Sequence, residues 1–195
     1  MDLNILHPSK AVDSAFEKPS IPIALVLVLL PSLAFLGGLA LYGKDISSFA
    51  VYEIILAYVT FFVLALIVFA LGLLFDGKKA KGKFAGTLCA LSLLQIVSLA
   101  FSVLSLIAMP LVLSPEAIEF ARHASGTDQI TEFLTLNPGA VNFAALAVFL
   151  AIGACLIVWG IYILYRGVRK LTETRAFTSL ILAIITLIIL GLLPI

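Results

Sequence analysis

The chain has 195 residues, of which 63% are hydrophobic and only 12% are charged. This composition excludes an ordinary soluble domain, in which about a quarter of the residues carry a charge. The net charge of +1 is an average over an uneven distribution, because the lysine and arginine residues gather between long apolar runs.

Residues 1–20 form a polar lead-in that predicts a short amphipathic helix. Pro8 suits the first turn of this helix and Pro19 ends it. Val12, Ala15 and Phe16 fall on one face. A short amphipathic helix directly before a span most simply lies in the inner membrane interface. Docking of this helix to a cytoplasmic partner is the alternative.

Five apolar runs follow, and each is long enough to cross a bilayer, because about 20 apolar helical residues match the hydrocarbon thickness. They occupy residues 21–42, 49–75, 84–113, 140–165 and 177–193. The runs leave no room for a separate soluble domain. The predicted fold class is therefore all-α: residues 21–195 form a polytopic transmembrane helical bundle with five spans, accompanied by short amphipathic interfacial helices.

The distribution of cations predicts the orientation of the bundle. Ten of the twelve lysine and arginine residues lie before the first span or in the second and fourth gaps between spans. Cytoplasmic segments collect lysine and arginine, because these residues are costly to translocate. The N-terminus is expected inside and the C-terminus outside.

The second span contains Glu53, which is the one ionisable residue inside an apolar run. A carboxylate within the membrane is a candidate functional group by default. Residues 54–75 are long enough to span alone, however, so Glu53 fits the outer interface equally well.

The second gap, 76–83, predicts a mobile basic loop beside the lipid headgroups, because glycines flank its lysines. Further cations leave the fourth span on the same side. The candidate contacts for anionic lipid or for a partner are Lys78, Lys79, Lys81, Lys83, Arg166, Arg169 and Lys170. Clustered cations near a membrane surface attract anionic lipid. The alternative is that they only enforce the orientation.

The third span has a stripe of polar residues on one face of the predicted helix. Its members are Ser92, Gln95, Ser98, Ser102 and Ser105. Such residues form hydrogen bonds across helix interfaces in lipid, so the stripe favours helix packing. A hydrated pathway along the stripe is the alternative.

Residues 114–137 predict two short amphipathic helices that form a lid on the outer surface. Ser114 suits an N-cap with Pro115 in the first turn. Glu116, Glu119 and His123 share a helical face and are metal-ligand types. Arg122 crowds the same face, and a solvated surface explains this pattern better. No metal or cofactor is expected.

Small residues predict close packing of the remaining spans. The first span contains Ala34 and Gly38 one turn apart. The fourth span has a ridge formed by Ala140, Ala144, Ala147, Ala151 and Ala154, with Gly153 and Gly160 nearby.

Three stretches carry a resemblance to a known family: a lead-in with Pro8 and Phe16, the glycine- and lysine-rich residues 77–88, and the exit of the fourth span at 159–171. Together with the layout, they resemble the Yip domain family, the Ypt/Rab-interacting five-span membrane proteins. The Asp-Leu-Tyr-Gly-Pro-like and Tyr-Gly-Tyr-Ser-like stretches of eukaryotic members are missing. The chain therefore looks like the short prokaryotic branch, for which the resemblance implies no settled activity. It assigns Rab binding to no residue here.

The sequence contains no intramembrane hydrolase constellation and no phosphate-binding Gly-rich loop, so an enzyme is not expected. The main hypothesis is a non-enzymatic protein of a prokaryotic cell membrane that organises membrane or partner proteins in a trafficking or scaffold role. The alternative is a small transporter or channel component that uses Glu53, Gln95 and the serine stripe. The expected partners are membrane lipids, including an anionic inner leaflet, and other membrane proteins, with no nucleic acid.

Overall fold

The computed structural model describes residues 1, 7–41, 46–47, 50–124, 127–173, 178–181 and 183–186, the side chains of 76–79 and 127 excepted. The helices named within this part of the chain are α1 (Pro8–Glu17), α2 (Ile21–Leu41), α3 (Ala50–Ala80), α4 (Phe84–Ser92), α5 (Leu94–Val112), α6 (Pro115–His123), α7 (Thr127–Leu136) and α8 (Phe143–Thr172), with a 3₁₀ turn at Pro138–Ala140. The all-α prediction is confirmed for the described residues.

Four helical stretches are long and apolar enough to cross a membrane: Ile21–Leu41, Ala50–Phe75, Phe84–Val112 and Phe143–Thr172. In length and composition they match the first four predicted spans. The fourth helix starts later than predicted and continues past residue 165 as far as Thr172. The predicted fifth span, 177–193, falls largely outside the described residues. The fifth span and the orientation stay predictions.

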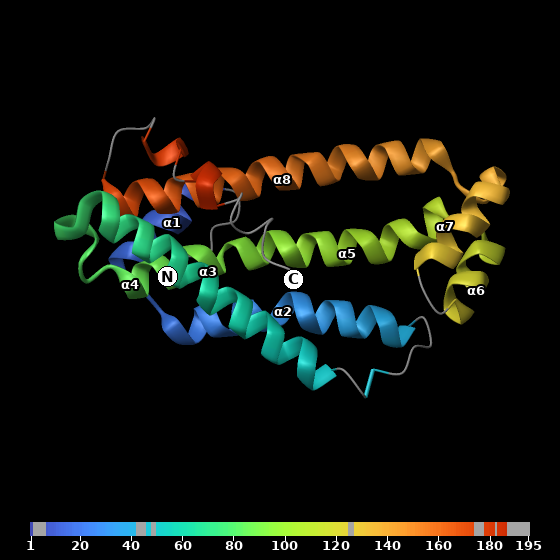
Figure 1. Cartoon of the computed structure of the whole chain (residues 1–195), viewed down its shortest axis with the longest axis horizontal. Coiled ribbons are helices and arrows are strands. Elements are labelled where there is room, and N and C mark those ends of the chain that lie inside the picture. Colours follow the sequence, from blue (N-terminus) through green and yellow to red (C-terminus); the bar gives the residue numbers. More distant parts are fainter. Residues whose placement is uncertain are drawn as a thin grey trace.

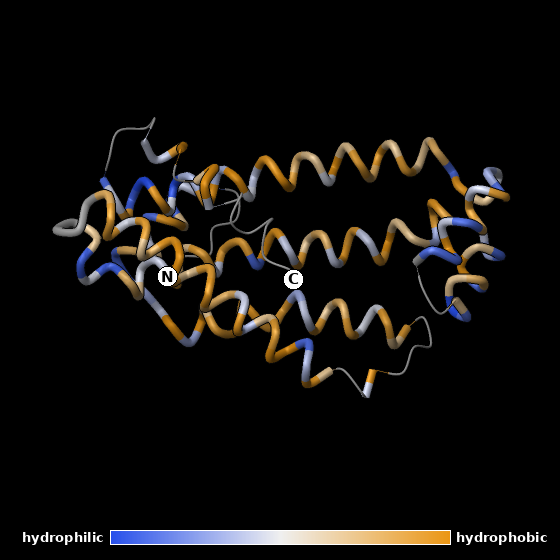
Figure 2. Tube along the Cα trace, viewed as in Figure 1, coloured by the Kyte–Doolittle hydropathy of each residue, from blue (hydrophilic) through white to orange (hydrophobic). Residues whose placement is uncertain are grey.

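The long helices lie along one axis, with α5 between α2 and α8 (Figure 1). Helix α3 slants across α2 and reaches α8 at one end of the molecule. Because successive spans alternate in direction, the start of α2, the start of α4 and the end of α8 lie at this same end, and α1 packs there. Helices α6 and α7 lie at the opposite end. Hydrophilic residues concentrate at the two ends and apolar residues between them (Figure 2).

Large apolar side chains cover much of the outside of the long helices. Leu33, Val59, Leu150 and Val158 are each more than half exposed. Such a continuous apolar surface would drive aggregation in water, but it is the surface that lipid tails require. This surface and the four long apolar helices identify an integral membrane protein.

The third span breaks at Leu93, which separates α4 from α5. In a regular helix the Leu93 N–H would donate to the Cys89 carbonyl, four residues earlier. The Ser92 hydroxyl instead donates to this carbonyl at 2.8 Å, and the Leu93 N–H donates to the Ala90 carbonyl at 3.3 Å. Competition by a serine side chain for a backbone acceptor bends helices. The sequence had predicted one uninterrupted helix.

The predicted loop at 76–83 is wrong in its extent, because α3 continues to Ala80 and only residues 81–83 separate it from α4. The end of α3 also doubles back. A Cβ added at Gly72 would lie 3.6 Å from the Ala80 Cβ, whereas eight residues of straight helix would advance by about 12 Å. Ala80 is fully buried, so its packing against the bundle accounts for the return of the chain.

Glycines allow the spans to approach closely, as predicted, but most of the alanine ridge does not pack, and of its members only Ala140 is buried. A Cβ at Gly38 would overlap the Leu106 side chain of α5, and one at Gly153 would contact Phe101 at 3.4 Å. By contrast, the ridge members Ala144, Ala147, Ala151 and Ala154 are exposed. Helix α8 turns its glycines toward α5, and the alanines therefore face away from the protein.

Candidate functional site

Helix α1 is docked onto the bundle at the end where the basic segments meet. Ala11, Val12 and Ala15 are buried against α4 and α8. The predicted lead-in helix is present as α1, and protein rather than lipid covers its apolar face. Its location in the inner membrane interface stays a prediction. The apolar face of an amphipathic helix can be buried against lipid or against protein. Here α4 and α8 provide a complementary protein surface.

Gly86 of α4 makes the close approach of α1 possible. A Cβ at Gly86 would lie 2.5 Å from Cδ1 and 3.1 Å from Cα of Phe16. Such a contact is closer than carbon atoms normally pack, at about 3.5–4.0 Å. The absence of a side chain at Gly86 therefore lets the backbone of α1 rest on α4.

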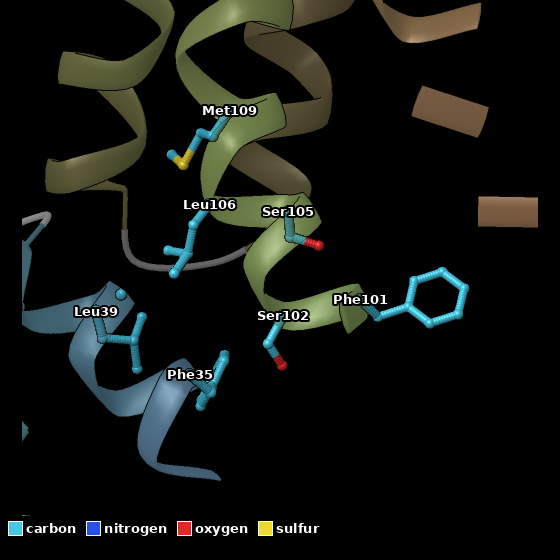
Figure 3. A pocket seen from close by; sticks show the side chains of 8 residues that line it. Phe35, Leu39, Phe101, Ser102, Ser105, Leu106 and Met109 are labelled. Carbon is cyan, nitrogen blue, oxygen red and sulfur yellow. The ribbon is translucent and has the colours of Figure 1, made fainter. Parts of the chain in front are cut away.

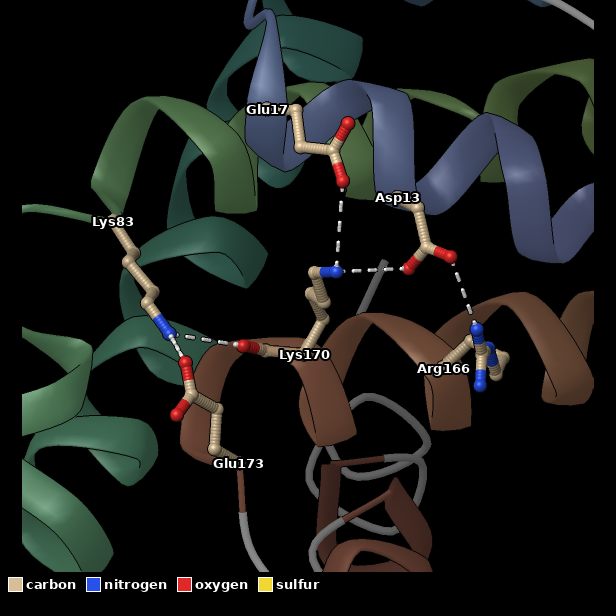
Figure 4. A network of polar contacts seen from close by, with 6 residues as sticks. All are labelled: Asp13, Glu17, Lys83, Arg166, Lys170 and Glu173. Carbon is tan, nitrogen blue, oxygen red and sulfur yellow. Dashed lines mark hydrogen bonds and ion pairs between the residues drawn. The ribbon is translucent and has the colours of Figure 1, made fainter.

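Ion pairs connect the polar face of α1 to the end of α8 (Figure 4). Asp13 accepts from Nη2 of Arg166 at 3.3 Å, and its second oxygen lies 3.3 Å from Nζ of Lys170. Glu17 lies 3.9 Å from the same Lys170 ammonium. These pairs are half-exposed, and such pairs contribute about 0–1 kcal/mol each. Full burial of a side chain such as Val12 contributes about 1.5–3 kcal/mol, so apolar packing dominates the docking.

Lys83 connects the start of α4 to the end of α8. Its ammonium donates to Glu173 at 2.6 Å and to the Lys170 carbonyl at 3.2 Å. That carbonyl belongs to the last turn of α8, where acceptors lack helical partners. Glu173 has a φ of 50°, a left-handed conformation that ends the helix. Lys83 thus caps α8 and joins two segments that are distant in the sequence.

A hollow of about 320 Å³ opens between α1 and α8, lined by Asp13, Arg166, Arg169, Lys170 and Glu173. Nε of Arg166 is enclosed, yet it has no hydrogen-bond acceptor among the described residues. The guanidinium has five donor hydrogens in a planar fork, and Asp13 engages only one of its nitrogens. None of the described carboxylates forms an ion pair with Arg169. The hollow therefore presents cationic donors that Asp13 only partly satisfies.

The comparisons with known proteins agree with this layout. A model of the Yip1 domain matches residues 3–195. The chain belongs to the Yip1 domain family. No curated protein and no solved structure matches it. The resemblance inferred from the lead-in, the turn before the third span and the exit of the fourth is confirmed. In this Yip1 domain all three stretches meet at the end of the molecule where α1, the start of α4 and the end of α8 lie, which we call the charged end.

The charged end gathers some of the predicted basic residues of the Yip1 domain. Lys83, Arg166, Arg169 and Lys170 lie together, and Lys81 is exposed in the turn beside them. The side chains of Lys78 and Lys79 lie outside the described residues. The sequence did not identify their carboxylate partners. The available signal was the position of Asp13 and Glu17 on the polar face of the lead-in helix.

The polar stripe behaves differently from the prediction of cross-helix hydrogen bonds. Ser92 donates to Cys89, Ser98 donates to the Leu94 carbonyl at 3.4 Å, and Ser102 donates to the Ser98 carbonyl at 3.1 Å. Each of these carbonyls lies three or four residues earlier in the same span. A hydroxyl can satisfy itself in this way without a neighbouring helix. Gln95 is half-buried and Ser105 is exposed.

Two grooves run beside α5. One of about 340 Å³ separates α5 from α2, and Ser102 and Ser105 line it together with apolar residues such as Phe35, Leu39 and Met109 (Figure 3). The other, of about 280 Å³, lies toward α8 and also includes Ser105. Neither Glu53 nor Gln95 lines either groove. Glu53 lies in the first turn of α3, half-buried.

At the opposite end, the two short helices predicted for residues 114–137 are present as α6 and α7, and their role as an outer lid stays a prediction. The rings of Phe120 and Phe133 stack with centroids 4.4 Å apart, which joins the two helices. The lid is also joined at its base, where the Ser114 N–H donates to the Ala140 carbonyl at 2.9 Å. The hydroxyl of Ser114 accepts from the Ala117 N–H at 3.2 Å, as expected for an N-cap.

The acidic face of α6 contains ion pairs. Glu119 accepts from Arg122 at 3.1 Å and lies 3.2 Å from the His123 ring. Within the described ranges, no group of three His, Cys, Asp or Glu residues could hold a metal ion. The Glu116 backbone N–H and then the Ser114 hydroxyl hold the pKa of the Glu116 carboxyl below its usual value. These contacts describe a solvated helix with a stabilised N-terminus.

Proposed function

We propose that this Yip1 domain protein is a non-enzymatic organiser of membrane or partner proteins, in a scaffold or trafficking role, with its charged end as the contact surface. The observation that carries the proposal is the docking of α1. Its apolar face is buried and its polar face is ion-paired to α8, while Lys10, Glu17 and Lys18 stay exposed. A partner at this end would meet a surface that is already ordered, and ordering an interface before binding lowers the cost of association.

The position of this surface supports the same proposal. It lies at the end where Lys83, Arg166, Arg169 and Lys170 gather, and cation-rich segments stay in the cytoplasm. We infer that the charged end faces the cytoplasm of a prokaryotic cell and that the C-terminus lies outside after a fifth span. Neighbouring membrane proteins and anionic lipids are then the available partners.

The test uses photo-cross-linking amino acids placed one at a time in the full-length protein in its native membrane. A probe at Lys10 or Lys18 should yield discrete adducts with a membrane protein. A probe at Arg122, which is exposed at the opposite end, is the matched control. A probe at Lys18 in a Gly86→Ala background should give fewer adducts, because α1 no longer rests on α4. Equal yields at both ends of the molecule would refute the proposal.

A small transporter is the second candidate, and one observation favours it. Ser102 and Ser105 are polar residues that line the groove between α2 and α5. Most of the groove is apolar, which ranks this candidate below the first. If the groove conducts a solute, the double variant Ser102→Ala/Ser105→Ala should change flux in reconstituted vesicles without changing thermal stability. Equal flux in both proteins would remove the transporter from consideration.

A further inference from the structure

The hollow at the charged end has the properties of an anion-binding site. The Asp13 carboxylate lies in it but satisfies only some of the cationic donors. Asp13 lies 3.3 Å from both Arg166 and Lys170. Charge-assisted hydrogen bonds between nitrogen and carboxylate are usually about 2.7–2.9 Å long. The carboxylate is thus shared between two cations, and both distances are longer than this range. Nε of Arg166 has no acceptor within the part of the chain that the structure describes.

A phosphate group would complete these contacts better than a carboxylate. It has more acceptor oxygens in a tetrahedral arrangement, and a guanidinium binds two of them side by side. Arg169 also lines the hollow without a carboxylate partner among the described residues. Among the described residues, the carboxylates that line the hollow are Asp13 and Glu173, and Glu173 is already paired with Lys83 at 2.6 Å. Asp13 is therefore the group that an incoming phosphate must displace.

The position of the hollow favours a lipid as the source of the phosphate. Arg166 follows Tyr165 directly, at the point where the apolar part of α8 ends. The preceding turns of α8 contain Trp159, Tyr162 and Tyr165, and aromatic residues of this kind are enriched at membrane interfaces. A side chain at this depth meets lipid headgroups, whose phosphates lie just outside the hydrocarbon.

We propose that the phosphate of an anionic phospholipid binds in the hollow to Arg166, Arg169 and Lys170, and that Asp13 of α1 is a built-in competitor for this site. Binding of the lipid breaks both Asp13 ion pairs and so loosens α1 from α8. This inference deepens the proposed function, because it assigns a ligand and a means of regulation to the same charged end.

The experiment is native mass spectrometry of the full-length protein in mild detergent, titrated with phosphatidylglycerol. Diacylglycerol with the same acyl chains is the phosphate-free comparison and should be retained far less. Arg169→Gln should weaken phosphatidylglycerol binding about fivefold, as expected for the loss of one near-surface cation. This variant breaks no ion pair of the described structure, so its folding should be unaffected. Arg122→Gln removes the same charge at the opposite end and should leave binding unchanged.

Asp13→Asn provides the sharper test, because it should strengthen binding by roughly fivefold. Glu17→Gln is the comparison, because it makes the same change of charge on the same helix, while Glu17 approaches only Lys170, at 3.9 Å, and does not line the hollow. Glu17→Gln should therefore have a much smaller effect. Equal effects of these two variants would overturn the proposal, since the change would then report only the overall charge of this end.

Competition with inorganic phosphate distinguishes the two possible sources of the anion, which are a lipid headgroup and free phosphate. At constant ionic strength, millimolar phosphate should not displace phosphatidylglycerol, because the lipid is also held by its acyl chains. Displacement by phosphate would show that the site takes the free anion, and would overturn the assignment to a lipid. Loss of the lipid site would not refute the proposed function, because cross-linking to partner proteins at Lys10 and Lys18 is measured independently.

Discussion

The contact between Gly86 and Phe16 predicts how one methyl group would loosen α1 from the bundle. In Gly86→Ala the new Cβ would lie 2.5 Å from Cδ1 and 3.1 Å from Cα of Phe16. Rotation of the Phe16 ring would relieve the first contact but not the second, because Cα belongs to the backbone. Helix α1 must therefore move away from α4.

The magnitude follows from two opposing contributions. Overpacking of a well-packed contact costs about 1–3 kcal/mol. Alanine is a better helix former than glycine by about 1 kcal/mol, which offsets part of this cost for α4. We expect the free energy of α1 docking to fall by about 1–2 kcal/mol, which corresponds to a factor of about 5–30 in the docking equilibrium.

Hydrogen exchange measured by mass spectrometry tests this value, because docking protects the backbone amides of α1. Peptides covering α1 should exchange about 5–30 times faster in Gly86→Ala than in the parent. Gly37→Ala is the matched control, since Gly37 lies inside α2 and an added Cβ there meets no atom within 4 Å. Unchanged exchange of α1 in Gly86→Ala, or an equal increase in Gly37→Ala, would refute the reasoning.

Three further predictions concern topology, the polar stripe and the lid. In a cysteine-free background, single cysteines at Lys170 and at Asp128 should be labelled from opposite sides of the membrane, and one at Ile195 from the same side as Asp128. Labelling of residue 195 from the Lys170 side would end the five-span model. Gln95→Leu should change thermal stability in detergent by an amount consistent with about 1 kcal/mol, as expected for an amide that packs at a helix interface. A larger loss of stability, or a loss of solute flux, would contradict a packing role. Because the pKa of Glu116 is lowered, its carboxylate stabilises α6 fully above the usual carboxyl pKa, and this stabilisation is lost as the pH falls through the lowered pKa. Protection of the α6 amides from hydrogen exchange should therefore drop in acid in the parent protein. It should not drop in Glu116→Gln.

The sequence alone predicted several features that depend on residues close together in the chain, although it missed the break in the third span at Leu93. The four described spans could be predicted because the length of an apolar helix must match the thickness of the bilayer. The N-cap at Ser114, the start of α1 at Pro8 and its end before Pro19 could be predicted because caps and breaks involve residues a few positions apart. Membership of the Yip1 domain family also followed from three local stretches and their order.

Contacts between distant residues were decided only by the tertiary structure. Nothing in the sequence pairs Asp13 with Arg166, which lies 153 positions away. The apolar face of α1 is equally compatible with lipid and with protein, and only the surface that α4 and α8 form around Gly86 selects protein. The same reason explains the exposed alanine ridge of α8. Hydropathy reports how strongly a side chain avoids water, whereas the choice between lipid and a neighbouring helix depends on the shape of the neighbour.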